Sequence, residues 1–145
     1  MTGYLLDVNV LVALLWPAHE AHQAALKWFQ RVGGKSWATC SVTQAGFVRI
    51  VSNPAFTSDA LSPQQAMELL EVNAEHPGHR FWKDDAGFLT VSAPFAERMT
   101  GHRQVTDAFL LGLALRHKGR VATLDRGMLG LIPPGMAEAP PEILG

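Results

Sequence analysis

The sequence has a single cysteine, Cys40, and no surplus of either charge, since 12 basic side chains stand against 13 acidic ones. One cysteine excludes a disulfide framework and a zinc site built from several thiolates, and it is typical of a reducing compartment. The net charge of −1 gives none of the overall basic character of many nucleic-acid-binding domains. Composition alone therefore indicates neither a secreted, disulfide-stabilised fold nor a nucleic-acid ligand.

Long hydrophobic runs are also absent. No uninterrupted apolar stretch reaches the roughly 20 residues that cross a bilayer, and no basic segment precedes Asp7, which interrupts the first apolar run. We therefore expect no signal peptide, no membrane partner and a cytoplasmic location. Hydrophobic residues nevertheless make up 48% of the 145 residues. That content suits one packed domain over residues 1–145 and excludes a disordered chain.

Short apolar segments alternate with helical patterns along the chain. The periodicity and the Gly, Pro and capping signals predict strands over 4–6, 37–40, 80–82, 88–91 and 121–124 and helices over 8–16, 20–32, 43–52, 62–74 and 106–118, with a short helix after Pro94. Gly119 is expected at the C′ position of the last helix, and a Pro-rich tail from about 130 is expected to be loop with a terminal edge strand. This order predicts an α/β fold, with a mostly parallel central sheet covered by helices on both faces.

Three of the six aspartates fall at one predicted edge of this sheet. Asp7 ends the first strand, Asp125 follows the last clear strand, and Asp107 lies in the first turn of the helix before it. Parallel strands bring such positions together, and ligands bind beyond the carboxyl ends of the strands. Any one of these aspartates alone is also what a helix cap or a turn requires, so the prediction depends on all three sharing the edge.

Carboxylates that converge in this way are costly without a cation. Two of them about 5 Å apart repel each other by about 3 kcal/mol at an effective dielectric constant near 20. Such a cluster must take up protons or bind an ion, and oxygen ligands of this kind select Mg²⁺ or Mn²⁺. The chemistry that this indicates is metal-assisted attack of water on a phosphate ester.

Four segments resemble the successive sequence blocks of PIN domains, in particular those of VapC-like toxins of bacterial toxin–antitoxin pairs. They occur in order over most of the chain, as Leu5–Leu11, Thr43–Arg49, His102–Ala108 and Ala122–Asp125. The resemblance implies a PIN-like three-layer sandwich and a Mg²⁺-dependent ribonuclease, with Mn²⁺ as a substitute. It also implies an RNA substrate, a VapB-like antitoxin and a homodimer.

The same resemblance implies roles for individual residues. Asp7, Asp107 and Asp125 match the acidic residues that surround the metal, with Asp7 and Asp107 holding it, while Asn9 and Thr123 match small polar positions beside them. The fourth acidic position, usually Glu, is Gln44 here, which carries no charge and cannot act as a base. Three arginines near the blocks are candidates for RNA phosphate contacts, although a solvated surface position is the simpler explanation for each: Arg49, Arg103 and Arg126.

Two other functions are compatible with parts of this pattern. A PIN-like module weakened by Gln44 would bind RNA or its antitoxin without cleaving. A phosphoryl-accepting receiver domain also places carboxylates and Mg²⁺ beyond a parallel sheet, but it normally has an adjacent acidic pair after the first strand and a Lys near the last. Here Val8 follows Asp7, and Arg126 follows Asp125, so the receiver alternative is the weaker of the two.

Overall fold

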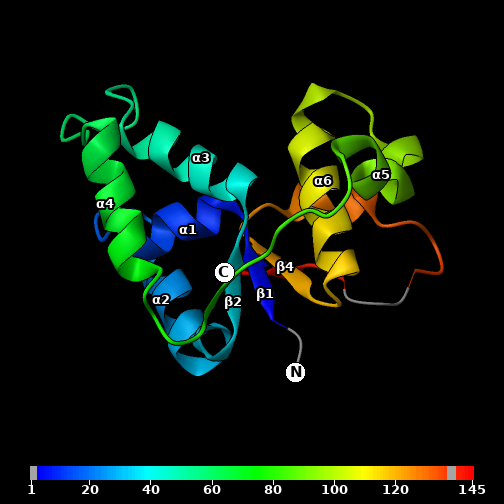
Figure 1. Cartoon of the computed structure of the whole chain (residues 1–145), viewed down its shortest axis with the longest axis horizontal. Coiled ribbons are helices and arrows are strands. Elements are labelled where there is room, and N and C mark those ends of the chain that lie inside the picture. Colours follow the sequence, from blue (N-terminus) through cyan, green and yellow to red (C-terminus); the bar gives the residue numbers. More distant parts are fainter. Residues whose placement is uncertain (1–2, 137–139) are drawn as a thin grey trace.

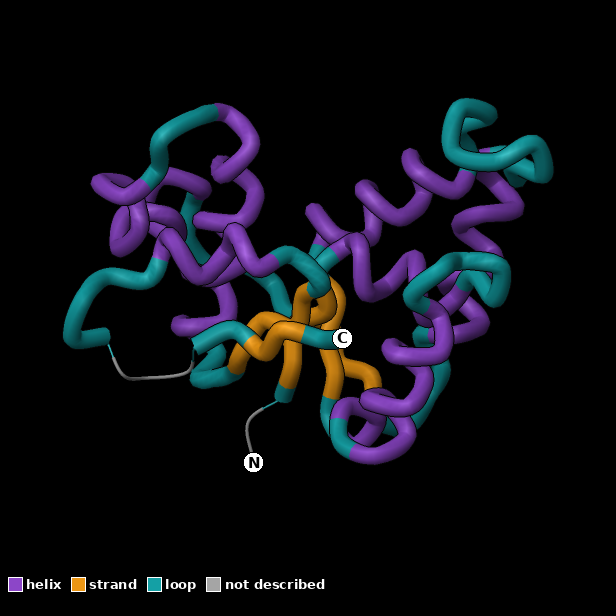
Figure 2. The backbone as a smooth tube through the Cα atoms, turned by 180° about the vertical axis from the view of Figure 1, so that it is seen from behind, coloured by secondary structure: helices purple, strands orange, loops and turns teal. Residues whose placement is uncertain are grey.

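The computed structural model describes residues 3–136 and 140–145, and its centre is a five-stranded sheet in which every strand pair is parallel (Figures 1 and 2). The spatial order is β3-β2-β1-β4-β5. The strands are β1 Tyr4–Leu6, β2 Trp37–Thr39, β3 His79–Phe81, β4 Arg120–Thr123 and β5 Glu142–Ile143. The strand that comes first in the sequence is therefore the central one, with β2 and β4 as its neighbours.

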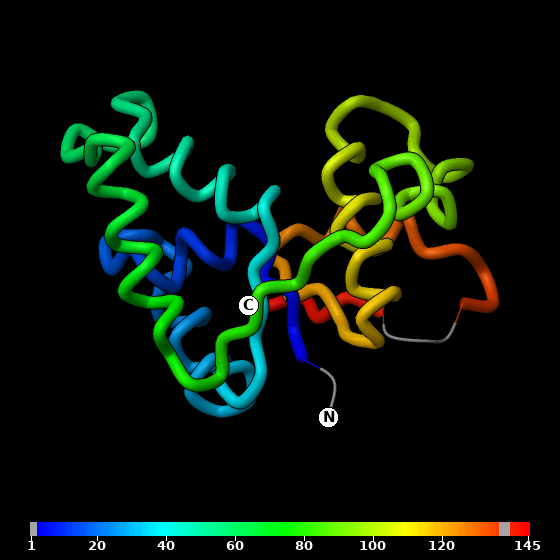
Figure 3. Tube along the Cα trace, viewed as in Figure 1, coloured from blue at the N-terminus to red at the C-terminus, as the bar shows by residue number. Residues whose placement is uncertain are grey.

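Helices cover the sheet in two groups. One group is α1 Val8–Leu15, α2 His22–Arg31, α3 Ser41–Val51 and α4 Pro63–Asn73, and the other is α5 Phe88–Ser92 and α6 Val105–Arg116. Short 3₁₀ segments lie at Gly33–Lys35, Ala93–Arg98, His102–Gln104 and Arg126–Leu131. Figures 1 and 3 show the two groups on opposite sides of the strands, so the predicted α/β class and three-layer arrangement are confirmed.

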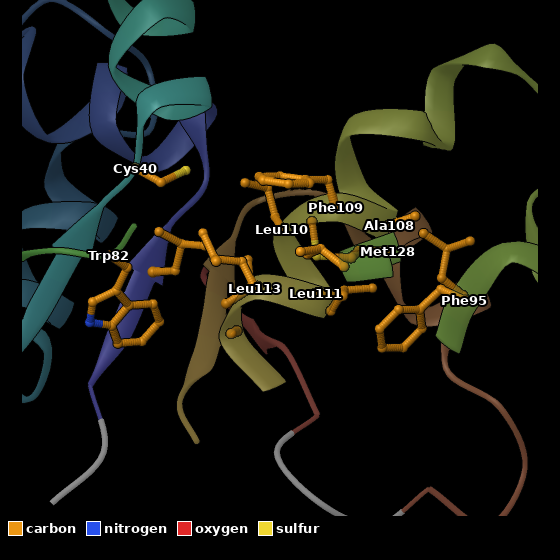
Figure 4. Packing of buried hydrophobic residues seen from close by; sticks show 14 of the residues in the cluster. Cys40, Trp82, Phe95, Ala108, Phe109, Leu110, Leu111, Leu113 and Met128 are labelled. Atoms are coloured by element: carbon orange, nitrogen blue, oxygen red, sulfur yellow. The ribbon is translucent and has the colours of Figure 1, made fainter. Parts of the chain in front are cut away.

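Alternate side chains of the strands pack into two separate hydrophobic cores, one on each face of the sheet. Leu5 packs in the core beneath α5 and α6, whereas its neighbour Leu6 packs in the core beneath α1 to α4. Val121 and Ala122 in β4 divide in the same way. Successive strand side chains point to opposite faces, so a short apolar strand can supply both cores at once. Figure 4 shows the core beside α6, with Leu110, Leu113 and Met128 within it.

The helix start predicted at Ser62 is present as a capping box. The Ser62 hydroxyl accepts a hydrogen bond from the Gln65 amide at 3.1 Å, and the Gln65 side chain accepts one from the Ser62 amide at 2.9 Å. Pro63 occupies the first helical position, where its missing N–H costs nothing. This local chemistry explains why α4 matches its predicted bounds to within a residue.

The strand predicted over 88–91 is wrong, because these residues form helix α5. Val91 and Ser92 are the buried residues of α5, and the Phe88 ring stacks on the Phe109 ring of α6 with the ring centroids 5.8 Å apart. The two helices approach so closely at Gly112 that a Cβ atom there would overlap the Val91 carbonyl oxygen. Tertiary packing on α6 therefore decides the conformation of a run that has no period of its own.

The end of α6 also differs from its prediction. Lys118, not Gly119, adopts the left-handed conformation at the C′ position, with φ of 58°. Gly119 is required for a different reason: a Cβ atom there would overlap the Trp82 ring and the Gly3 carbonyl oxygen. The predicted edge strand of the tail is present as β5, whose Glu142 lies opposite Ala122 of β4, and the tail residues 137–139 lie outside the described residues.

Within the described part of the chain, no helix combines the length and apolar character needed to cross a membrane.

Candidate functional site

The carboxyl ends of three adjacent strands carry the polar side chains of the candidate site. Asp7 directly follows the central strand β1 and caps α1, and each neighbouring strand ends in a fully buried threonine, Thr39 in β2 and Thr123 in β4. A buried hydroxyl at the end of a strand needs a hydrogen-bond partner. Thr123 is hydrogen-bonded to Asp7 and Asn9, and Thr39 is hydrogen-bonded to Gln44 of α3 and to His79 at the start of β3.

Asp7 is buried, and both of its carboxylate oxygens are in use. Oδ1 accepts the Val8 backbone N–H at 2.7 Å, and Oδ2 accepts the Thr123 hydroxyl at 2.7 Å. Burial raises the pKa of Asp7, the two hydrogen bonds act in the opposite direction, and the nearby charge of Asp125 raises it further. Each carboxylate oxygen can accept more than one hydrogen bond, so Asp7 is oriented by the protein and still able to bind a cation.

Thr123 links Asp7 to the loop after β4. Its hydroxyl oxygen accepts the Asp125 backbone N–H at 3.0 Å and the Asn9 side-chain amide at 3.3 Å. The Asn9 side-chain oxygen in turn accepts the Leu124 N–H at 3.2 Å. Asn9 and Thr123 therefore fix the start of α1 against the end of β4, which holds the Asp7 carboxylate in one orientation.

Asp107 and Asp125 complete an acidic edge, the name used below for Asp7, Asp107 and Asp125 together. Asp107 lies half-buried in the first turn of α6, and Asp125 is exposed and caps the following turn by accepting the Gly127 N–H at 2.8 Å. The pKa of Asp107 is raised to about 6, first by burial and then by the charges of Asp7 and Asp125. Residues a hundred or more positions apart in the sequence, such as Asp7 and Asp107, thus act on one another electrostatically.

No protein cation neutralises this acidic edge within the described ranges. The ion pairs there are Arg116 with Asp85 and Arg120 with Glu142, neither of which includes an acidic-edge residue. Among residues 3–136 and 140–145, moreover, no group of three or more His, Cys, Asp or Glu side chains forms a ready-made metal cage. The donor set therefore fits a hard cation that takes one or two carboxylates and completes its shell with water, as Mg²⁺ commonly does.

Gln44 lies in the first turns of α3, at the same edge of the sheet. Its side-chain Nε2 donates a hydrogen bond to Thr39 Oγ1 at 3.0 Å, and this oxygen also lies 2.8 Å from His79 Nε2. His79 opens strand β3, one residue before the predicted start of that strand. Sequence reasoning missed both Thr39 and His79, and the available signal was that Thr39 ends its strand as Thr123 does.

The three candidate arginines are all exposed, but they lie in different places. Arg103 is in the 3₁₀ turn before α6, and Arg126 directly follows Asp125, so these two flank the acidic edge in sequence. Arg49 is in the last turn of α3, more than one helical turn beyond Gln44. None of the three forms an ion pair within the part of the chain that the structure describes.

Comparison with known proteins gives consistent matches. The family model of the PIN domain matches residues 4–130. Ribonuclease VapC39 of Mycobacterium tuberculosis is 40% identical over 134 residues, covering 92% of this chain and 96% of that protein. Ribonuclease VapC38 of the same organism is 42% identical over 127 residues, covering 88% of each chain.

A solved structure shares the fold at low sequence identity. It is VapBC2 from Rickettsia felis bound to a DNA fragment from its promoter, with a TM-score of 0.61, 14% identity, and coverage of 90% of this chain and 92% of that one. The family model and the two VapC relatives cover most of the chain on sequence, and the solved structure covers it on fold. The chain therefore belongs to the PIN-domain family, among its VapC proteins.

Proposed function

We propose that this chain is the toxin of a toxin–antitoxin pair and acts as a metal-dependent endoribonuclease that hydrolyses RNA phosphodiester bonds. The observation that carries the proposal is the electrostatic coupling at the acidic edge. The charges of Asp7 and Asp125 contribute to raising the pKa of Asp107 to about 6, and no protein cation relieves them among the described residues. Binding of a divalent cation would relieve the repulsion between these carboxylates.

Mg²⁺ is the cation we propose, with Mn²⁺ as a substitute. Asp7 and Asp107 would hold it, and when bound it supplies charge neutralisation on the phosphate and acidifies water. Asp7 suits this role because Thr123 and Val8 already fix its orientation. Asp125 adds a third carboxylate that can accept a proton or a water hydrogen bond, and Gln44 adds an uncharged amide at the same edge.

RNA is the substrate class we propose, with Arg103 and Arg126 as the residues closest in sequence to the acidic edge that can contact its phosphates. Asn9 and Thr123 act on the substrate indirectly, because their side chains are occupied with Asp7 and the β4 loop. Arg49 would reach only RNA that extends along α3. Because the net charge is only −1, RNA binding would depend on the local placement of these arginines and not on the overall charge of the protein.

A VapB-like antitoxin and a second copy of the chain are the proposed protein partners. Support for the antitoxin comes from the VapBC2 structure, which shares the fold over 90% of this chain. An antitoxin would block the acidic edge until it is removed. The homodimer is a proposal that size-exclusion chromatography with light scattering can test.

Incubation of the purified chain with single-stranded and structured RNA tests the activity, with Mg²⁺ and then with EDTA. We expect cleavage that requires the metal and that falls at least about a hundredfold in Asp7→Asn and Asp107→Asn, since each removes a proposed ligand. Asp84→Asn, which alters an exposed carboxyl elsewhere in the chain, is the matched control and should cleave normally. Metal-independent cleavage, or full activity in both acidic-edge variants, would refute the proposal.

A further inference from the structure

Gln44 is the one position at which this chain departs from the acidic pattern of its family, and its side chain is held by two further residues. Gln44 Nε2 donates to Thr39 Oγ1 at 3.0 Å, and Thr39 Oγ1 lies 2.8 Å from His79 Nε2. Thr39 is fully buried. These three side chains, from α3, β2 and β3, form a hydrogen-bond chain that is called the relay below.

The protonation of His79 gives the relay a direction. Burial lowers the pKa of His79, and the charges of Arg80 and His76 act in the same sense, so the ring is neutral near pH 7 and carries one N–H. Gln44 Nε2 can only donate, so Thr39 Oγ1 accepts this bond and its own hydroxyl proton is left for the ring nitrogen 2.8 Å away. His79 Nε2 is therefore an acceptor, and the ring proton lies on Nδ1.

This arrangement holds the Gln44 amide in one orientation. A Thr39 hydroxyl that donates its single proton to His79 Nε2 can only accept from Gln44. The Gln44 NH₂ group therefore stays turned toward Thr39, which leaves Oε1 as the free end of the side chain. Within residues 3–136 and 140–145, no hydrogen bond is directed at this oxygen.

We propose that Thr39 and His79 are positioning residues that orient the Gln44 amide so that its oxygen, not its NH₂ group, is presented at the acidic edge. An oxygen in this place can accept a hydrogen bond from water or interact with a cation, as the carboxylate of Glu would, whereas an NH₂ group would repel the cation. The relay thus offsets part of the cation affinity that is lost when the charged Glu side chain is replaced by Gln. The catalytic consequence rests on the proposed function, but the orientation itself does not.

The first test is the tautomer of His79, which needs neither RNA nor metal. Long-range ¹H–¹⁵N NMR of the full chain near pH 7 should show the proton on Nδ1 and an unprotonated Nε2. A proton on Nε2 would make the ring the donor to Thr39 Oγ1 and would remove the acceptor of the Thr39 proton, which would overturn the proposal. The Thr39→Val variant should change the ¹⁵N shift of His79 Nε2, while Thr39→Ser should restore it.

The second test measures coupling between His79 and Gln44 with Mn²⁺ affinity and RNA cleavage as readouts. His79→Leu should weaken Mn²⁺ binding and lower kcat by about fivefold each, with KM unchanged, which is what one hydrogen bond of about 1 kcal/mol corresponds to. His79→Gln should restore most of this loss, because its side-chain oxygen can accept the Thr39 proton. Thermal melting of each variant separates this effect from loss of folding.

The Gln44→Glu background makes the test decisive. Once Leu replaces His79, the Thr39 hydroxyl can donate its proton to the carboxylate, which has no NH₂ group to misdirect. In this background His79→Leu should therefore change either readout by less than about twofold. An equal loss in both backgrounds would show a purely structural role for His79 and overturn the proposal. If the unaltered chain cleaves no RNA with Mg²⁺, the proposed function fails, while the tautomer and the Mn²⁺ affinities still decide the relay.

Discussion

Removing the charge of Asp107 should make the metal-free protein more stable at neutral pH. The pKa of Asp107 rises from 3.8 to about 6 on folding, so the folded protein binds more protons than the unfolded chain between about pH 4 and pH 6. Its stability therefore falls as the pH rises through this window and stays low above it. The raised pKa of Asp7 acts in the same direction.

The size of the effect follows from the same shift. The difference between 3.8 and about 6 corresponds to about 3 kcal/mol in full. Asp107 is only half-buried, so solvent screening reduces this to about 1–2 kcal/mol. The loss of a negative charge in the first turn of α6 offsets about 0.3–1 kcal/mol of the gain. We expect Asp107→Asn to be more stable by about 1 kcal/mol at pH 7.5, taking these terms together.

Urea unfolding in EDTA at pH 5 and pH 7.5 measures this change. The unaltered protein should lose stability between the two pH values more steeply than Asp107→Asn does. Addition of Mg²⁺ at pH 7.5 should stabilise the unaltered protein and have little effect on the variant. Asp84→Asn, at an exposed position outside the acidic edge, should behave as the unaltered protein. An Asp107→Asn variant that is destabilised equally at both pH values would refute the reasoning.

Three further substitutions, with Gly87→Ala as a control, test the fold and the site. Thr123→Val removes the hydroxyl that donates to Asp7 and should destabilise the protein by about 1.5–3 kcal/mol, the range for hydrogen bonds to charged groups; an unchanged urea midpoint would contradict this. Gly112→Ala places a Cβ against the Val91 carbonyl oxygen and should lower stability by about 1–3 kcal/mol, whereas Gly87→Ala, where a Cβ meets nothing within 4 Å, should be nearly neutral in the same calorimetric measurement. Gln44→Glu adds a fourth carboxylate to the edge and should tighten Mn²⁺ binding about tenfold or more, and weaker binding by calorimetry would argue against this placement of Gln44.

Most of the sheet could be predicted because neighbouring residues in the sequence determine where its strands and helices begin and end. The strand ending at Asp7 and the helix that stops before Pro17 are separated by length and by the capping aspartate. The capping box at Ser62 fixes the start of α4 through backbone contacts within three residues. The shared edge of parallel strands then brings distant aspartates together without any knowledge of the side-chain packing.

The failures have a common physical cause in contacts between elements. Residues 88–91 are four consecutive apolar or small residues, whose pattern has no period, and only packing on α6 makes them helical. Glycine is the residue type preferred at a helix C′ position, but Gly119 is needed because a Cβ atom there would overlap the Trp82 ring. The relay joins three elements through Thr39 and His79, so the strand-end position of Thr39 could indicate that residue alone and not its link to His79.

Titration of the metal-free chain with Mn²⁺ by calorimetry at pH 7.5 tests most directly whether the acidic edge is a cation site. We expect the unaltered chain and Asp84→Asn to bind the ion with the same affinity. Asp7→Asn and Asp107→Asn should each bind it at least about tenfold more weakly, because each removes one of the carboxylates that hold it. Undiminished Mn²⁺ affinity in both acidic-edge variants would contradict the account.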